Sequence, residues 1–597
     1  MKEANVDLPS NSETDVLVEN DRAPAAPAWM HEHSPSALWR SLFREDRFFL
    51  VLSVFIGIFA GLAVVCFRFA IDWSRLYLLG TGAVLTPARM LLAPTLAGLV
   101  IAVLVMHFFP TTRGGGVNQT KAALYIYNGH IPIRTAIGKF ICAALAIGSG
   151  HSLGPEDPSL QIGACLASVM GRKMRLSRDR MRLIAPVGAA AGLAAAFNAP
   201  ISAVLFVIEE VIGRWTAGIL GSVVLSAVSS VVVMRWFLGS ESLFRIPAVE
   251  LKRPTELIAY AILGVVGGLA SVAFSSGIAT FRPRCKALPR WTQYFQPAIA
   301  GLLIGIIAVL GAPQVMGAGY EYIDQAMHGQ FTWEFLAILA GLKILATLLS
   351  FVSGTPGGMF APTLFIGAML GAAVGGAEHA FLPHLAVSPG TYALVGMGVL
   401  FAGFLRVPMT SVFMVLEVSG NYSIIVPVIV ANTFAYVISR GLQPIAIFDM
   451  LTRQDGLELP SMEEQREEGI LRVEDAMRPV QGPVLDAEKT VDQALREVDH
   501  TENDDLLVRL SPSGWSIISK QQLVAMANDG KAAANLGSVL PIRRVPYLHP
   551  DHPLETALRY VDRWAIVPVV SRADFRRLEG VITQRDVLER YREFGEG

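Results

Sequence analysis

The sequence predicts an all-α polytopic membrane domain built on an internal repeat with broken helices, followed by a smaller α/β module. Of the 597 residues, 52% are hydrophobic and only 17% are charged, whereas soluble domains carry about 25% charged residues. Apolar stretches alternate with short polar joints between residues 47 and 447, and charged residues return after residue 449. This change in composition divides the chain into a membrane part and a soluble part.

Several apolar stretches are long enough to cross the roughly 30 Å hydrocarbon core of a membrane, while others are short for a full span. The predicted membrane segments are Phe48–Ile71, Met90–Phe109, Ala217–Phe237, Leu257–Thr280, Ala298–Leu310, Phe335–Val352 and Ile424–Val437. Residues 1–44 are polar, acidic and rich in Pro and Ala, without the basic start and apolar core of a secretion signal. They are predicted to form a disordered cytoplasmic tail.

Composition and spacing also exclude several classes of function. The formal net charge of -1 offers no basic surface for nucleic acid, and the four cysteines lack the spacing of a metal site or of a disulfide framework. The sequence contains no HExxH motif, no metal cluster and no nucleophile with an adjacent base. An enzyme is therefore not expected.

Two regions of the membrane part repeat each other. Residues 154–164 match residues 358–368 in a framing glycine, a proline and the ending Leu-x-Ile-Gly-Ala, and residues 200–209 match residues 408–417 at nearly the same offset. Gly and Pro interrupt the apolar sequence in both copies, which a membrane tolerates only where protein or water satisfies the freed backbone groups. Broken helices at matching places in two halves predict a solute site at the repeat interface, near the midplane.

Gly-rich turns at helix starts suggest what the solute is. Residues 154–158 (Gly-Pro-Glu-Asp-Pro) and 358–362 (Gly-Met-Phe-Ala-Pro) each open an apolar helix, and residues 114–116 are three glycines that supply a third turn. A helix N-terminus carries about half a positive charge and unpaired N–H groups, which together attract anions. No Lys or Arg lies inside these motifs, which favours conduction over tight binding. Helix packing and turn chemistry are the alternative explanation for each single break.

Glu156 is an ionisable residue inside an apolar stretch, which by default indicates function. Its counterpart in the second repeat is Phe360, so the scaffold does not require a carboxylate at this position. A carboxylate there can compete with the anion when ionised and move aside when protonated. The alternative is a first-turn acid favoured by the helix dipole, a description that suits Asp157 better.

The repeat also separates two neighbouring glutamates. Glu209 has its counterpart in Glu417, whereas Glu210 corresponds to Val418. A glutamate common to both halves is expected to be structural, and the one confined to a single half is the better candidate for a proton site. A Glu210 side chain that extends to the membrane edge is the alternative.

The C-terminal module is itself doubled, with short strands alternating with helices in each copy. In the second copy, Thr583 and Asp586 have the spacing of a capping box at a helix start. The first copy has Ser519 and Gln522 in these places. Because Gln is a poorer partner than Asp for a ribose diol, any nucleotide site would depend on the second copy.

Together these motifs resemble the CLC family of chloride channels and proton-coupled chloride transporters, over about residues 45–450. The resemblance implies that Glu156 is the gating glutamate, that the backbone amides of Met359 and Phe360 bind the central anion, and that Glu210 is the internal proton glutamate. It also implies inverted repeats, a homodimer with one pathway per subunit, and cytoplasmic termini. The C-terminal module resembles a tandem CBS pair, which in this family is regulatory and often binds adenine nucleotides.

The sequence departs from the family pattern at the anion site. The family's Gly-Arg-Glu-Gly-Pro motif becomes residues 154–158 (Gly-Pro-Glu-Asp-Pro), so Pro155 and Asp157 replace its arginine and its second glycine. The family's Gly-Ser-Gly-Ile-Pro turn becomes residues 114–118 (Gly-Gly-Gly-Val-Asn), so Gly115 replaces the hydroxyl that contacts the central anion, with Gly116 beside it. The anion-contacting tyrosine aligns with Phe448, or with Ala446 if the gap is shifted. Both losses are expected to leave the inner constriction wider and less polar. The site residues expected to contact the anion are Gly115, Gly116, Gly154, Met359, Phe360 and Phe448.

The resemblance implies transmembrane exchange of chloride, and of other small anions, against protons in a lipid bilayer, gated by Glu156 and modulated through the CBS pair. A passive voltage- or ligand-gated anion channel is the alternative, and a sensor centred on the CBS pair is a third reading. No cofactor is required, apart from an adenine nucleotide that the CBS pair could hold. The expected location is a bacterial inner membrane. The expected domains are residues 1–44 (tail), 45–450 (membrane domain, with repeats at about 45–240 and 255–448), 451–470 (linker) and 471–597 (tandem CBS).

Overall fold

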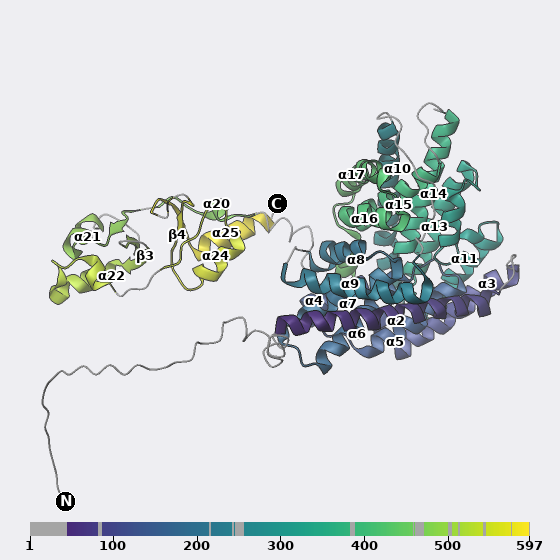
Figure 1. Ribbon diagram of the computed structural model, residues 1–597, viewed down its shortest axis with the longest axis horizontal. Helices are drawn as coiled ribbons and strands as arrows, with labels where there is room; N and C mark the ends of the chain where they lie inside the picture. The colour runs from purple at the N-terminus through teal and green to yellow at the C-terminus, as the bar shows by residue number, and fades with distance from the viewer. Residues whose placement is uncertain are drawn as a thin grey trace, which may run out of the picture.

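The computed structural model describes residues 45–457, 459 and 471–595, except 81–85, 214–216, 241–243, 245–255, 382–388 and the short stretches 481, 499–503, 511–513, 541–544, 573 and 575. The N-terminal tail and nearly all of the linker therefore lie outside the described residues. Figure 1 shows a large helical body followed by a smaller body of mixed helices and strands. This is the division that the change in composition predicts.

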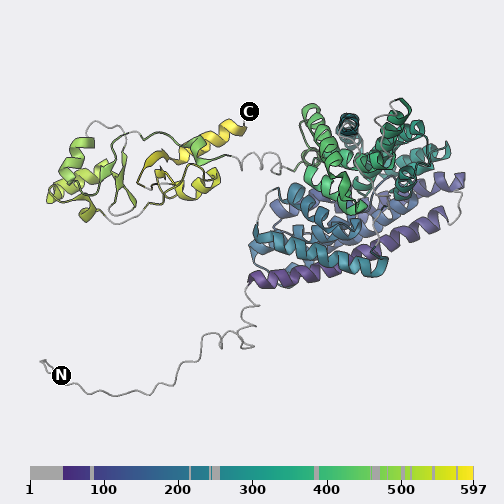
Figure 2. The same ribbon diagram turned by 45° about the horizontal axis from the view of Figure 1, so that its top comes forward.

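The first half of the helical body runs from α2 to α9, and its helices are crowded together in both ribbon views (Figures 1 and 2). The elements are α2 (Glu45–Leu79), α3 (Pro87–Val103), α4 (Val117–Tyr125), α5 (Ile133–Ser149), α6 (Glu156–Lys173), α7 (Arg178–Phe197), α8 (Pro200–Phe206), the π-helical continuation η4 (Val207–Ile212) and α9 (Ala217–Leu238).

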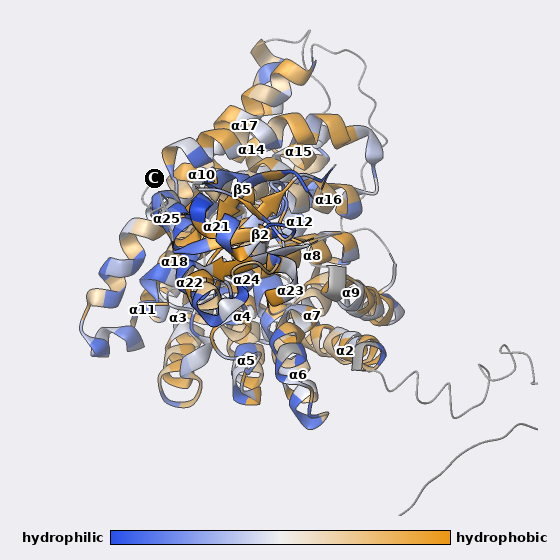
Figure 3. Cartoon of the chain, turned by 90° about the vertical axis from the view of Figure 1, so that its left-hand side faces the viewer, coloured by the Kyte–Doolittle hydropathy of each residue, from blue (hydrophilic) through white to orange (hydrophobic). Residues whose placement is uncertain are grey.

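The second half repeats this order of long and broken helices. The elements are α10 (Glu256–Ala287), α11 (Gln296–Val309), α12 (Tyr320–Met327), α13 (Trp333–Val352), α14 (Phe360–Phe381), α15 (Pro389–Leu405), α16 (Pro408–Ser419), α17 (Ile425–Leu442) and α18 (Ile447–Gln454). Within the described residues, eight helices are long and apolar enough to cross a membrane. Hydropathy colouring shows apolar residues along most of these helices (Figure 3), so the prediction of a polytopic helical membrane domain is confirmed.

Contacts between α3 and α11 reveal how the halves are related. A Cβ on Gly98 would come within 2.6 Å of the Pro297 carbonyl, and a Cβ on Gly301 would come within 2.3 Å of the Pro94 carbonyl oxygen. Residue numbers rise along one helix as they fall along the other, so the two helices cross antiparallel. Pro297 and Gly301 follow Pro94 and Gly98 by the same offset, so the repeats pack through a two-fold relation.

Close helix packing recurs at equivalent places in both halves. A Cβ on Gly163 of α6 would lie 2.2 Å from the Gly188 carbonyl oxygen of α7, and one on Gly367 of α14 would lie 2.3 Å from that of Gly396 of α15. Without a hydrophobic driving force between helices in lipid, small residues that let backbones approach are what favour association. These glycines fix the position of the helices α6 and α14, whose first turns form the site.

The C-terminal body contains two similar copies. Its elements are α20 (Val473–Ala476), β1 (Leu485–Asp486), α21 (Val491–Val498), β2 (Asp505–Arg509), β3 (Trp515–Ser519), α22 (Lys520–Met526), α23 (Leu536–Val539), α24 (Leu554–Val561), β4 (Val567–Val570), β5 (Leu578–Ile582) and α25 (Gln584–Gly595). In the first copy, β1 pairs parallel with β2, which pairs antiparallel with β3. In the second, Leu548 bridges parallel to β4, which pairs antiparallel with β5. The doubling expected from the sequence is therefore present.

The expected boundary at residue 450 falls inside α18, which continues to Gln454. Two cations of α10, Arg282 and Lys286, bond the Asp455 carboxylate just beyond this helix. The membrane domain therefore extends past the expected boundary. The reason is that α18 is amphipathic. Its buried face packs on the helical body, while its polar residues belong to the return of charged residues that placed the expected boundary at residue 450.

Candidate ion-transport site

The starts of α6 and α14 meet inside the helical body. Gly154 and Gly358 exchange two backbone hydrogen bonds as an antiparallel bridge, with N–O distances of 2.8 Å from Gly154 and 2.9 Å from Gly358. The two residues are counterparts in the repeats, so the bridge lies on the two-fold axis. The convergence of paired helix N-termini expected from the sequence is therefore observed.

Glu156 is fully buried in the first turn of α6, yet its side chain reaches across to α14. Its Oε2 atom accepts a hydrogen bond from the backbone N–H of Ala361 at 3.3 Å. Its Oε1 atom has no hydrogen-bond partner among the described residues. The carboxylate therefore occupies a position at the N-terminal end of α14, where an anion is expected to bind.

A cavity of about 370 Å³ is lined by Pro155, which precedes Glu156 in the chain, by Arg68 and Asp72 of α2, and by Pro313 and residues 316–322. Arg68 donates a hydrogen bond to the Ala196 carbonyl at 3.3 Å. Pro155 stands where the resembled motif has arginine, and Arg68 brings a guanidinium into the neighbourhood from another helix. The sequence does not point to Arg68, because an arginine in a long membrane helix has many explanations.

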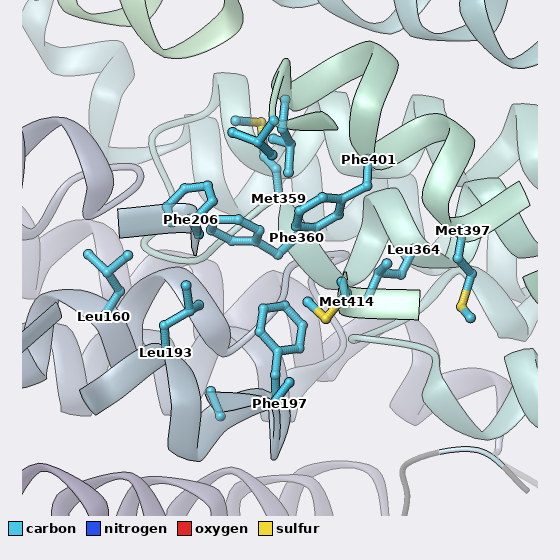
Figure 4. Packing of buried hydrophobic residues seen from close by; sticks show 14 of the residues in the cluster. Leu160, Leu193, Phe197, Phe206, Met359, Phe360, Leu364, Met397, Phe401 and Met414 are labelled. Carbon is cyan, nitrogen blue, oxygen red and sulfur yellow. The ribbon is translucent and has the colours of Figure 1, made fainter. Parts of the chain in front are cut away.

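Phenylalanine rings surround the other side of the site. The ring of Phe360 lies 5.0 Å from that of Phe206, 5.6 Å from that of Phe401 and 6.3 Å from that of Phe448, measured between centroids. Figure 4 shows Phe206, Phe360 and Phe401 side by side, with Phe197 pointing towards them. Phe448 is thus the residue of α18 that reaches the Phe360 ring, and it contributes no hydroxyl.

Asp157 connects the α6 start to the third Gly-rich turn. Its Oδ1 atom accepts hydrogen bonds from the backbone N–H groups of Gly116 at 2.6 Å and Val117 at 2.9 Å. Asp157 therefore caps α4, not its own helix. The sequence assigned Gly116 to the anion, but its amide is bonded to this carboxylate. That assignment is corrected because an acid 41 positions further along the chain satisfies the donor.

The same carboxylate explains why residue 115 is glycine. A Cβ on Gly115 would lie 2.5 Å from the Asp157 Oδ2 atom, closer than side-chain atoms approach. The two departures from the family pattern, Gly115 for serine and Asp157 for glycine, are therefore linked, because a side chain at residue 115 and the Asp157 carboxylate would need the same space. The hydroxyl is absent because a carboxylate stands in its place.

Two buried lysines hold the turns before α4 and α12. The Lys139 ammonium donates to the carbonyl oxygens of Thr112 at 3.1 Å and Gly114 at 2.5 Å. The Lys343 ammonium donates to those of Val315 at 2.9 Å and Gly317 at 2.8 Å. Because both copies keep the arrangement, we interpret it as structural.

Glu209 and Glu417 cap each other's helices. Glu209 accepts hydrogen bonds from the N–H of Thr410 at 2.8 Å and from its hydroxyl at 2.6 Å, at the start of α16. Glu417 accepts the equivalent bonds from Ser202 at 2.8 and 2.6 Å, at the start of α8. Each glutamate thus satisfies the exposed donors of the opposite repeat, which is the structural role that the sequence comparison predicts for them.

Glu210 points elsewhere and forms an ion pair. Its Oε1 atom lies 2.7 Å from the Lys121 ammonium of α4, which also lies 3.0 Å from Oδ1 of Asp449 on α18. Glu210 lies in the π-helical turn η4, a kind of irregularity that is frequent at functional sites. These contacts are not predictable from the sequence, because 89 and 328 positions separate Lys121 from its partners.

In the C-terminal body, Thr583 and Asp586 form the expected capping contacts. The Thr583 N–H and hydroxyl both donate to Asp586 Oδ2, at 2.9 and 2.7 Å. The other carboxylate oxygen, Oδ1, lies 2.5 Å from Nε of Arg478. A cleft of about 370 Å³ between the two copies is lined by these three residues, by Arg585 and by Asp504 and Asp505 of the first copy.

The fold and the site define a class: an integral membrane protein with two inverted repeats, whose broken helices point their N-termini at a buried carboxylate. The family described as Voltage gated chloride channel matches residues 97–440, and the CBS domain family matches residues 536–593. The chain therefore belongs to the CLC family and carries a CBS domain at its C-terminal end.

Curated relatives agree with this assignment. The chain is 31% identical to the "Putative chloride channel protein ClcB-like" of Ralstonia nicotianae, over 69% of this chain and 99% of that protein. It is 32% identical to the "H(+)/Cl(-) exchange transporter ClcA" of Vibrio campbellii, over 66% of this chain and 87% of that protein.

Solved structures resemble the chain as well. A slow cyanobacterial Cl⁻/H⁺ antiporter matches with a TM-score of 0.62 at 25% identity, covering 68% of this chain and 97% of that one. A eukaryotic CLC transporter matches with a TM-score of 0.58 at 19% identity, covering 90% of this chain and 97% of that one; at that identity the likeness concerns the fold alone.

Proposed function

We propose that this protein exchanges small anions, chloride foremost, for protons across a membrane. The observation that carries the proposal is the position of the Glu156 carboxylate, which accepts a hydrogen bond at the start of α14 in the place suited to an anion. The exchange named for the relatives from Vibrio and for the cyanobacterial antiporter supports it.

Competition between the carboxylate and the anion links the two fluxes. When Glu156 is ionised, it occupies the helix start and excludes the anion. When it takes a proton, it loses its attraction to the positive end of the helix, and the backbone amides of Met359 and Phe360 can hold the anion instead. One proton is thus bound whenever an anion passes, and Glu210 connects Glu156 with the opposite side.

A passive anion channel on the same scaffold is the second candidate. The specific observation that favours it is that neither Phe448 nor Gly115 supplies a hydroxyl to hold an anion on the inner side. A weakly held anion can pass without waiting for a proton. Coupling looser than that of a relative with both hydroxyls is therefore expected.

Flux measurements on purified protein in liposomes distinguish these candidates. A chloride gradient should drive protons uphill in the wild type. Glu156→Gln should keep anion flux but lose its pH dependence and the proton movement, and Glu210→Val should stop protons while sparing anions. Wild-type protein that conducts anions and moves no protons under any gradient would establish the channel instead.

We also propose that the cleft of the C-terminal body binds an adenine nucleotide. Asp586 would hold the ribose, while Thr583, Arg585 and the N-terminus of α25 would face the phosphates. Arg478 now pairs with Asp586, so the nucleotide would have to displace it.

Calorimetry of ATP binding to the full-length protein in detergent tests this second proposal. Asp586→Ala should abolish the heat of binding. Asp551→Ala removes an acid of the same copy that pairs with Arg572 outside the cleft and should leave binding unchanged. No heat at saturating ATP in the wild type would leave Thr583 and Asp586 with their capping role alone.

We infer that the protein is a homodimer in a bacterial inner membrane, with both termini in the cytoplasm. The bacterial relatives support the location, and membership of the family supports the dimer. Single-molecule photobleaching of singly labelled protein in liposomes should show two bleaching steps per particle, and predominantly single steps would contradict the dimer.

A further inference from the structure

Three buried charged groups from distant parts of the chain meet beside the proposed proton pathway. Lys121 of α4 contacts Glu210 of η4 at 2.7 Å and Asp449 of α18 at 3.0 Å. The three side chains are 0%, 4% and 10% exposed, respectively. Resemblance and repeat comparison assign only Glu210, so the other two residues have no role yet.

The charges of these groups do not balance. One ammonium and two carboxylates give a net charge of -1 when all three are ionised. A buried charge is tolerable only when an opposite charge lies beside it. An uncompensated charge in a low-dielectric interior is strongly unfavourable. A single added proton makes the group neutral, since Lys121 can remain paired with the carboxylate that stays ionised.

Several charged groups of the adjoining elements, within the part of the chain that the structure describes, contact residues outside this group. Arg182 of α7 donates to the Leu124 carbonyl, Arg282 of α10 pairs with Asp455, Glu209 of η4 caps α16, and Arg453 of α18 is exposed. The Tyr125 hydroxyl of α4 donates to the Ile212 carbonyl. Each of these contacts is made to a residue other than Lys121, Glu210 and Asp449.

We propose that Lys121, Glu210 and Asp449 act together as the inner proton site, which alternates between a net charge of -1 and neutrality. Asp449 is the positioning residue: its charge lets Glu210 accept a proton while Lys121 is present. The step adds one proton to a carboxylate oxygen and breaks no covalent bond. Without Asp449, Lys121 and Glu210 form a neutral pair, and protonating Glu210 would leave a buried ammonium without a counter-charge. This inference deepens the proposed exchange and rests on it.

Three variants test it by chloride and proton flux in liposomes. Asp449→Asn should lower proton flux relative to anion flux at neutral pH, because Glu210 then binds a proton less readily beside Lys121. The expected decrease is about tenfold or more, the factor that corresponds to one unit of proton affinity. Lys121→Met should move the pH dependence of proton flux to higher pH, since two adjacent carboxylates without the ammonium retain one proton. The double variant should recover coupling, because Glu210 can then gain a proton without stranding a positive charge.

Because Lys121 and Asp449 are in contact, the effects of the two changes on stability need not add, so the readout that a merely structural role would not move is the pH dependence of the proton-to-anion ratio. Asp455→Asn, an acid just beyond the same helix that pairs with Arg282 and Lys286, is the matched control and should leave coupling unchanged. An unchanged ratio in Asp449→Asn, or a double variant no better than it, would overturn the proposal. If Asp449→Asn does not fold, the direction of the shift in Lys121→Met decides. Absence of proton flux in the wild type would instead overturn the exchange itself.

Discussion

The reciprocal glutamate caps give a quantitative test of the two-fold scaffold. Replacing Glu209 by Gln keeps the shape of the side chain but removes its charge and puts an NH₂ group where an oxygen faced backbone donors. Hydrogen bonds to charged groups contribute about 1.5–3 kcal/mol and neutral ones about 0.5–1.5 kcal/mol. With contacts to the N–H and the hydroxyl of Thr410 and to the N–H of Met409, the loss should be about 3 kcal/mol in the free energy of unfolding.

Glu417→Gln should cost about the same, because Glu417 makes the equivalent contacts to Ser202 and Ile201. Unfolding of the purified variants in detergent, followed by denaturant titration, gives the two values. Chloride and proton flux of the same preparations should keep the wild-type ratio, since Glu209 faces α16 and not the proton pathway.

Either of two results would refute the purely structural role of the two glutamate caps. A Glu209→Gln variant that loses proton coupling at unchanged stability would make this residue part of the pathway. A large loss of stability in one variant with none in the other would show that the caps are not equivalent, and the two-fold relation would then not explain why both halves retain the acid.

Two further predictions concern the space shared by Asp157 and Gly115 and the contact between Arg478 and Asp586. Gly115→Ser alone should destabilise the protein, because its Cβ would lie 2.5 Å from Asp157 Oδ2. The double variant with Asp157→Gly removes this clash together with the cap of α4 and should bind chloride more tightly than the wild type by calorimetry; unchanged chloride affinity would contradict this. Arg478→Gln should tighten ATP binding to the full-length protein, since it frees one Asp586 oxygen, and weaker binding would show that the guanidinium holds the phosphates.

Hydropathy predicted most of the long spans, but the helices α5, α7, α14 and α15 are absent from the predicted membrane segments. Spans such as α2 and α13 are strongly apolar although only 50% of their most apolar stretch is buried within the protein, so length and composition reveal them. The window in α7 has a lower hydropathy of 1.2 and is 78% buried within the protein, because its Ala and Gly residues serve close packing and not contact with lipid. Its place could be inferred only from the helices that surround it.

Short motifs were interpreted correctly where the residues that bond each other are close in the sequence. Thr583 and Asp586 form the expected cap because three positions separate them. Asp157 was also expected to be a capping acid, but the helix that it caps begins 40 positions earlier. The partners of Glu210 were likewise unpredictable, since nothing in a single sequence shows that α4 and α18 meet.

Agreement and disagreement between the repeats have different physical causes. A two-fold scaffold is held by groups that bond across its axis, so the residues that carry it, such as Gly154 with Gly358, recur in both halves. A transport pathway has two different ends, and a proton that enters at one end must leave at the other. If both repeats carried the same titratable groups along this pathway, its two ends would be alike. Glu156 and Glu210, which the second repeat replaces by Phe360 and Val418, are therefore where the symmetry must break if the protein couples protons to anions.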